Sequence, residues 1–107
     1  MIRIIYMTLT LYGHPVSQPT RAILIYCELN KISIEFKVVD MMQGEHKKEE
    51  YLKLNPNGLV PTLVDGDFIL YESHAILRYL HETQNGKPQY YPSNSKKRAL
   101  IDQYLDW

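Results

Sequence analysis

In the first part of the chain, polar and apolar residues first alternate, then follow a helical spacing, and then alternate again. Polar and apolar residues alternate over 8–12, and Gly13-His14-Pro15 ends this stretch, which predicts a strand followed by a turn. Apolar residues recur at helical spacing over 17–30 and predict a helix of about three turns, beginning at or just after Ser17. Alternation returns over 34–38 and predicts a second strand.

The middle of the chain predicts a short helix, a turn and a hairpin. Charged and then apolar residues over 45–54 favour a short, poorly buried helix, and Asn55-Pro56-Asn57-Gly58 predicts a turn. Two apolar stretches, 59–64 and 68–70, flank Asp65-Gly66, which is typical of a type I′ hairpin. We therefore expect these two stretches to pair as antiparallel strands.

The last part of the chain predicts two helices separated by a polar segment. A helical pattern that begins at Ser73 ends at Asn85-Gly86, and a proline-containing connection follows to about residue 95. Residues 96–107 begin another amphipathic helix, which the end of the chain cuts off. We expect the chain to be either a fragment of a longer protein or a natural truncation.

These elements predict an α/β fold with a mixed four-stranded sheet. A right-handed crossover joins the first two strands in parallel, and the hairpin adds antiparallel strands. We divide the chain into an N-terminal extension (1–7), an α/β domain (8–84), a linker (85–95) and the start of a helical region (96–107).

Composition excludes several classes of partner. Twelve basic and twelve acidic residues cancel, so no overall field recruits nucleic acid or an anionic membrane. Residues 1–7 are too short for a signal peptide or a membrane span, and no other apolar run is long enough to cross a membrane. The single cysteine, Cys27, excludes an internal disulfide and indicates a reducing, cytoplasmic environment. Within its apolar helical stretch, Cys27 is interpreted as a packing residue.

Pro61 stands inside an apolar stretch that otherwise predicts a strand. Proline has no N–H to donate, so it is excluded from a central strand position, and an ordinary trans proline at a strand start is one interpretation. In the alternative the Val60–Pro61 bond is cis. The N–H and C=O of Val60 then face outward and can pair with an extended, peptide-like ligand.

Glu72, Ser73 and Ser17 lie at predicted helix starts and each has two interpretations. Ser73 is the expected N-cap of its helix, with Glu72 as a solvated acid. Alternatively, Ser73 and the helix N-terminus bind a ligand carboxylate while Glu72 pairs with an ammonium group, as an α-amino acid requires. Ser17 either caps its helix or donates a hydrogen bond to a thiolate, and no neighbouring base equips it as a nucleophile.

The basic run His46-Lys47-Lys48 lies between acidic residues and is either a solvated helix face or a clasp for a carboxylate. No metal site is predicted, because the four histidines of the chain lack ligand spacing.

Taken together, these segments resemble the N-terminal, thioredoxin-like domain of cytosolic glutathione S-transferases over nearly all of residues 8–91. Three matches are Ser17-Gln18-Pro19-Thr20-Arg21-Ala22, Asn55-Pro56-Asn57-Gly58-Leu59-Val60-Pro61 and Glu72-Ser73-His74-Ala75-Ile76. The first is similar to the serine-type theta class, whereas Gly13-His14-Pro15 and Gly44-Glu45-His46-Lys47-Lys48 are similar to the phi class. The theta class is the nearer of the two.

The resemblance implies a thioredoxin-like order of elements, βαβ-α-ββα, and a glutathione site. By this resemblance Ser17, beside Gln18, stabilises the glutathione thiolate. Val60, before a cis Pro61, pairs through its backbone with the cysteinyl unit, and Gln18 and Leu59 are also glutathione-binding residues. The γ-glutamyl group is held by Glu72 and Ser73, and the glycine carboxylate by His46 and Lys47.

The resemblance also implies the activity and the partners. It implies conjugation of glutathione, as co-substrate and without a metal, to an electrophilic small molecule in a homodimer. Family members continue into an all-helical domain that supplies most of the electrophile pocket, so we expect weak or no activity from this chain alone. The alternative is a non-catalytic association module similar to that of elongation factor 1 gamma. Thioredoxin-like disulfide exchange is disfavoured because Ser17 stands in the region where a reactive cysteine is needed.

Overall fold

The computed structural model describes residues 9–107 and contains four strands, four α-helices and two 3₁₀ turns. The predicted N-terminal extension lies outside the described residues. The strands are β1 (Leu9–Gly13), β2 (Glu35–Val38), β3 (Thr62–Asp65) and β4 (Phe68–Tyr71). The α-helices are α1 (Gln18–Leu29), α2 (Glu49–Leu52), α3 (Ser73–Thr83) and α4 (Ser95–Asp106), and the 3₁₀ turns are η1 (Met41–Gln43) and η2 (Glu45–Lys47).

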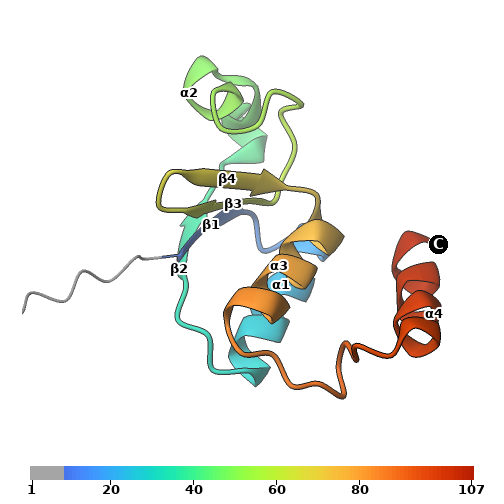
Figure 1. Cartoon of the computed structure of the whole chain (residues 1–107). Helices are drawn as coiled ribbons and strands as arrows, with labels where there is room; N and C mark the ends of the chain where they lie inside the picture. Colours follow the sequence, from blue (N-terminus) through green and yellow to red (C-terminus); the bar gives the residue numbers. More distant parts are fainter. Residues whose placement is uncertain (1–8) are drawn as a thin grey trace, which may run out of the picture.

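The four strands form one mixed sheet in the order β2-β1-β3-β4 (Figure 1). Strand β1 runs parallel to β2, with Leu11 opposite Phe36, and antiparallel to β3, with Leu11 opposite Leu63. Strand β4 pairs antiparallel with β3. The predicted α/β class and the thioredoxin-like arrangement are therefore confirmed.

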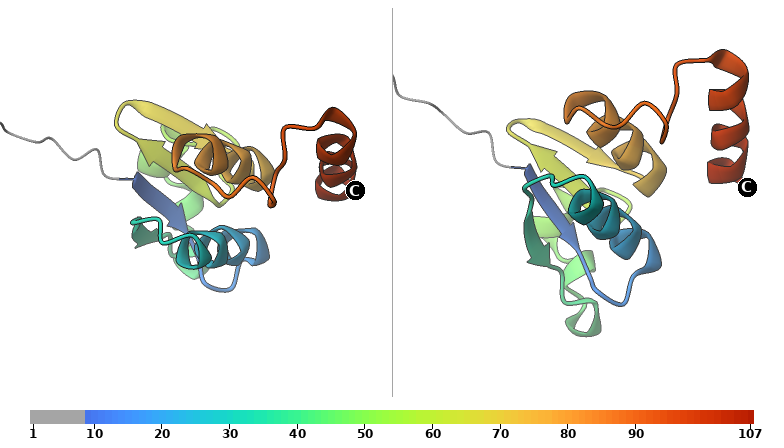
Figure 2. Two further views of the ribbon diagram at one scale, coloured as in Figure 1. Left: turned by 60° about the horizontal axis from the view of Figure 1, so that its bottom comes forward. Right: turned by 90° about the horizontal axis from the view of Figure 1, so that it is seen from below.

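Helices α1 and α3 lie side by side on one side of the sheet, and the α2 region lies on the other side (Figures 1 and 2). Fully buried side chains from both layers meet between them: Leu11 and Leu63 from the sheet, Ile23 from α1, and Ile76 and Leu80 from α3. Burial of such side chains supplies about 1.5–3 kcal/mol each. Packing in this apolar layer determines the positions of the helix N-termini relative to the ends of the strands.

The hairpin differs from its prediction in two respects. Strand β3 begins at Thr62 and not at residue 59, because Pro61 has no N–H to contribute to a ladder. Asp65 pairs with Phe68, so the two-residue loop is Gly66-Asp67. Only Gly66 of the two has a positive φ, 64°, whereas a type I′ turn requires positive φ at both positions. The predicted Asp65-Gly66 type I′ turn is wrong.

The short, poorly buried helix predicted over 45–54 is confirmed, but it covers only part of that range. The chain forms the 3₁₀ turn η2, passes through an extended Lys48 (φ −79°, ψ 152°), and then forms the four-residue helix α2. Only Tyr51 of α2 is buried. With so little apolar surface to bury, this segment lacks the packing that stabilises longer helices.

Helix α4 stands apart from α1 (Figure 2), and three ion pairs connect it to α3. The Arg78 guanidinium lies 3.1 Å from an Asp102 oxygen and 3.2 Å from an Asp106 oxygen, and Arg98 lies 3.4 Å from Glu82. The start of α4 at residue 95 lies close to the predicted position. No helix in the described part of the chain is long and apolar enough to cross a membrane.

Cys27 is predicted to be unreactive in the folded protein. It is buried in the α1–sheet core, and this burial raises the pKa of its thiol to about 11. Because the thiolate is the nucleophile, Ellman's reagent should label the native chain far more slowly than the urea-unfolded chain at pH 7.5. Native labelling should accelerate as the pH rises toward 11. Equal rates in the native and unfolded chains would contradict a packing role.

Candidate functional site

A small cavity of about 90 Å³ lies where three distant segments of the chain converge. These are the start of α1, the turn and loop before β3, and the junction between β4 and α3. The lining residues are Pro19, Asn55, Asn57, Leu59, Val60, Pro61, Tyr71, Glu72 and Ser73. The fold thus brings together the predicted residues Leu59, Val60, Pro61, Glu72 and Ser73, although Glu72 comes 11 positions after Pro61 in the sequence.

The Val60–Pro61 segment presents unpaired backbone groups at this cavity. The Val60–Pro61 peptide bond is cis, as the resemblance implied. Neither the N–H nor the C=O of Val60 has a hydrogen-bond partner among residues 9–107. An N–H and a C=O on one residue can pair with an extended peptide in the manner of a strand edge.

Glu72 and Ser73 occupy different positions from those predicted. The N-cap of α3 is Glu72, and Ser73 is the first helical residue, so the prediction of Ser73 as N-cap is wrong. Glu72 has φ 78° and ψ 113°, a conformation that costs a non-glycine residue about 1–3 kcal/mol. Its side chain is exposed and makes no capping bond. The carboxylate and the free N–H groups of α3 therefore lie together at the cavity, with opposite electrostatic character.

Ser17 is the N-cap of α1, and its Oγ accepts a 3.3 Å hydrogen bond from the Thr20 N–H. A serine hydroxyl has one donor and two acceptor positions, so this cap leaves the donor available. The His14 Nδ1 atom accepts from the Val16 N–H at 3.1 Å, and no hydrogen bond joins the His14 ring to the Ser17 hydroxyl. Arg21 braces the preceding loop by donating to the carbonyls of Pro15 and Val16 at 3.0 and 2.9 Å.

Four predicted residues do not line the cavity. Ser17 and Gln18 directly precede Pro19, which does. His46 and Lys47 lie beside the loop that leads into the cavity: a Cβ placed on Gly58 would be 3.0 Å from the His46 carbonyl oxygen and 3.1 Å from Lys47 Nζ. The buried Nδ1 atom of His46 has no hydrogen-bond partner among the residues that the structure describes. No group of three potential metal-ligating side chains occurs within residues 9–107.

The structure adds residues that sequence reasoning did not assign to the site. Asn55, Asn57 and Tyr71 line the cavity, and Tyr51 lies behind it. The two asparagines were interpreted only as turn formers. The sequence indicates a role for them only through their position in the segment that leads to Pro61. The pattern of polar and apolar residues does not show which way the side chain of a turn residue points.

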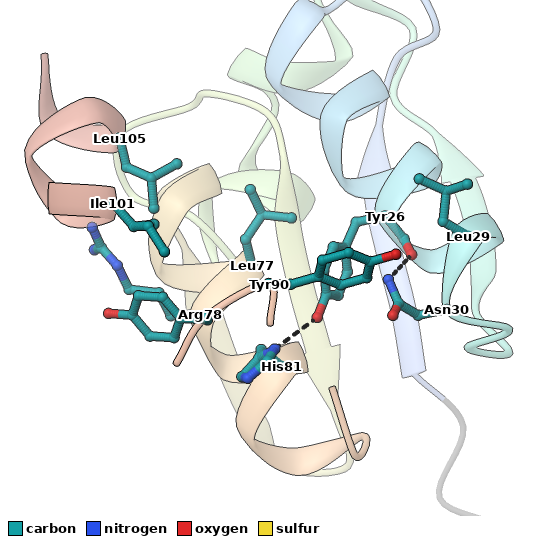
Figure 3. Close-up of a pocket in the computed structure, with 10 residues that line it drawn as sticks. Tyr26, Leu29, Asn30, Leu77, Arg78, His81, Tyr90, Ile101 and Leu105 are labelled. Atoms are coloured by element: carbon teal, nitrogen blue, oxygen red, sulfur yellow. Dashed lines mark hydrogen bonds between the residues drawn. The ribbon is translucent and has the colours of Figure 1, made fainter. Parts of the chain in front are cut away.

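A second, larger cavity of about 260 Å³ lies between α1, α3 and α4. Figure 3 shows Ile101 and Leu105 of α4 on one side of it and Tyr26 and Leu29 of α1 on the other. The Tyr26 hydroxyl in this cavity lies 3.1 Å from the His81 Nδ1 atom, and Arg78 is ion-paired with Asp102 and Asp106. This cavity contains none of the predicted site residues and presents no free charged group, so the smaller cavity is the candidate site.

Comparisons with known proteins identify one family. The family model "Glutathione S-transferase, N-terminal domain" matches residues 7–82. Human glutathione S-transferase theta-2 is 46% identical over 101 residues, which cover 94% of this chain and 41% of the relative. Glutathione S-transferase 1 of Manduca sexta is 41% identical over 100 residues, covering 92% of this chain and 46% of the relative.

Solved structures show the same similarity. The crystal structure of human glutathione transferase theta-2, in complex with glutathione and an unknown ligand, has a TM-score of 0.89 at 45% identity. The match covers 92% of this chain and 41% of that structure. The chain therefore spans about two fifths of the length of the relatives it matches.

Proposed function

Because the chain belongs to the glutathione S-transferase N-terminal domain family, we propose that it is the glutathione-binding region of a theta-class glutathione transferase. In this proposal the site holds glutathione, stabilises its thiolate and presents the sulfur to an electrophilic small molecule. The whole protein forms a cytoplasmic homodimer, as the family resemblance implies, and uses no metal.

One observation carries the proposal. The unpaired backbone groups of Val60, the exposed carboxylate of Glu72 and the N-terminus of α3 line a single cavity. A γ-glutamyl-cysteinyl peptide offers the complementary groups: an ammonium for Glu72, a carboxylate for Ser73 and the helix N-terminus, and an amide backbone for Val60.

The remaining predicted residues complete the binding of the tripeptide. His46 and Lys47, next to Gly58, receive the glycine carboxylate, and the unpartnered Nδ1 atom of His46 is a free polar group in that segment. Ser17, with Gln18 beside it at the start of α1, donates its free hydroxyl hydrogen to the sulfur. Because this bond favours the charged form, it lowers the pKa of the bound thiol. The thiolate then forms a bond to the electrophile, and the leaving group departs with its electron pair.

The proposal is tested by calorimetric titration of the chain with glutathione, using two isosteric variants. Glu72→Gln removes the charge that pairs with the γ-glutamyl ammonium and should weaken binding about tenfold. Glu50→Gln, which alters an exposed acid on α2 outside the cavity, is the matched control and should bind as the wild type does.

The same titration separates the proposal from the association-module alternative. An association module retains the fold and has no need of glutathione. Absence of binding by the wild-type chain would favour that alternative, and equal weakening by both glutamate variants would remove Glu72 from its assigned role.

A further inference from the structure

A buried polar cluster lies directly behind the Leu59–Val60 peptide. It consists of Tyr51 from α2, Asn55 from the following turn and Thr62 from the start of β3, which are 5%, 2% and 0% exposed. Polar side chains this deeply buried cost free energy unless all of their hydrogen-bonding groups are satisfied. The positions of these three side chains are therefore restricted by the hydrogen bonds that they must make.

The cluster converges on one carbonyl group. The Leu59 carbonyl oxygen accepts a hydrogen bond from the Tyr51 hydroxyl at 2.6 Å and another from Asn55 Nδ2 at 3.0 Å. The Leu59 side chain is exposed, so apolar packing does not hold this residue in place. Its position is set through its backbone.

The hydrogen bonds of the cluster fix which group donates and which accepts. Asn55 Oδ1 accepts from the Asn57 N–H at 3.0 Å, which identifies the other end of the amide as the donor to Leu59 and to Thr62 Oγ1. The single Tyr51 hydroxyl hydrogen goes to Leu59, so Thr62 is the donor in its 2.7 Å bond to Tyr51. The cluster thus connects the residues on either side of Val60 and Pro61.

Fixing this carbonyl also fixes the Val60 N–H. The Leu59 carbonyl and the Val60 N–H belong to one planar trans peptide group, in which the two bonds point in opposite directions. Since Tyr51 and Asn55 orient the carbonyl toward themselves, the unpaired N–H of Val60 is directed away from them.

We infer that Tyr51, Asn55 and Thr62 are positioning residues that orient the Val60 peptide group for the backbone of a bound γ-glutamyl-cysteinyl peptide. They need not touch the ligand themselves. This inference rests on the proposed function, because it assigns Val60 to the binding of glutathione.

The test compares two tyrosine variants that each lose a buried or half-buried hydroxyl group. Tyr51→Phe removes the bond to the Leu59 carbonyl and the bond from the Thr62 hydroxyl, whereas Tyr79→Phe removes the bond to Asp65, outside the cavity. Tyr51→Phe should weaken glutathione binding about tenfold in calorimetry, because the Leu59 carbonyl loses one of the two donors that orient it. Tyr79→Phe should leave the affinity within about twofold of wild type, although both variants unfold at a lower temperature.

A second measurement separates positioning from general destabilisation. In ¹H–¹⁵N spectra, glutathione should shift the Val60 amide proton downfield in wild type and in Tyr79→Phe, and less in Tyr51→Phe. If Tyr51→Phe does not fold, Thr62→Val and Thr62→Ser provide the same comparison: the valine variant loses affinity and the serine variant retains it. Failure of the wild type to bind glutathione overturns the proposed function and this inference together. Binding by the wild type with equal affinity in both tyrosine variants overturns the positioning role alone.

Discussion

Replacement of Ser17 by alanine should raise the pH at which bound glutathione ionises by about one to two pH units. The Ser17 hydroxyl hydrogen is free in the structure, and a hydrogen bond to a charged group contributes about 1.5–3 kcal/mol. The backbone and carboxylate contacts of the peptide do not involve Ser17, so glutathione should still bind. The thiolate absorbance of the bound peptide, followed in the ultraviolet during a pH titration, measures the change.

Two matched variants control this experiment. Ser17 also caps α1, and loss of a cap costs about 1 kcal/mol of stability. Asn94→Ala removes the equivalent cap of α4, in which Asn94 Oδ1 accepts from the Lys97 N–H at 3.0 Å, far from the cavity. It should leave the titration unchanged, and Ser17→Thr should retain most of the wild-type behaviour. An identical titration curve for Ser17→Ala and wild type would remove Ser17 from thiolate stabilisation.

Replacement of Leu63 by alanine should lower the free energy of unfolding by about 2–5 kcal/mol. Leu63 is 0% exposed and lies in β3, between β1 and β4 and under α1 and α3. The substitution removes apolar surface from the layer that holds the sheet to both helices and leaves a cavity there. For a chain of this size the loss is a large part of the total stability.

Urea unfolding followed by circular dichroism measures this loss, with Leu100→Ala as the control. Leu100 is a leucine in α4 that is 66% exposed, so its removal should change stability by less than about 0.5 kcal/mol. Similar losses for the two variants would show that the α1–α3–sheet layer is not the main core of the chain.

The sequence predicts the sheet and its main helices because their periods are unambiguous. Alternation over 34–38 and helical spacing over 17–30 each admit one solution, since the apolar set must face a single core. The predictions fail where the apolar pattern is weak. Helix α2 buries only Tyr51, and the loop of the hairpin is decided by the pairing of Asp65 with Phe68, which a single residue of slippage changes.

Several of the residues that line the candidate site can be predicted from the sequence, whereas the residues behind them that orient the Val60 peptide cannot. Val60 and Glu72 are singled out by proline and by a helix start, and the family resemblance connects them. Tyr51 and Thr62 carry no such signal, because their roles depend on hydrogen bonds between segments that only the fold brings together. The positive φ of Glu72 is likewise invisible in the sequence, since local propensity favours Ser73 as the cap.

The two ion pairs between Arg78 and α4 restrict the rotation of α4 about its own axis, in addition to attaching α4 to α3. Asp102 and Asp106 are one helical turn apart and lie on the same face of α4, so a single guanidinium reaches both. Rotation of the helix by one residue position, about 100°, moves both carboxylates away from Arg78 at once. The two ion pairs can therefore form together in only one rotational orientation of α4 relative to α3. Added residues within 84–94 would lengthen the connection without changing that orientation, and an added residue between 102 and 106 would destroy it.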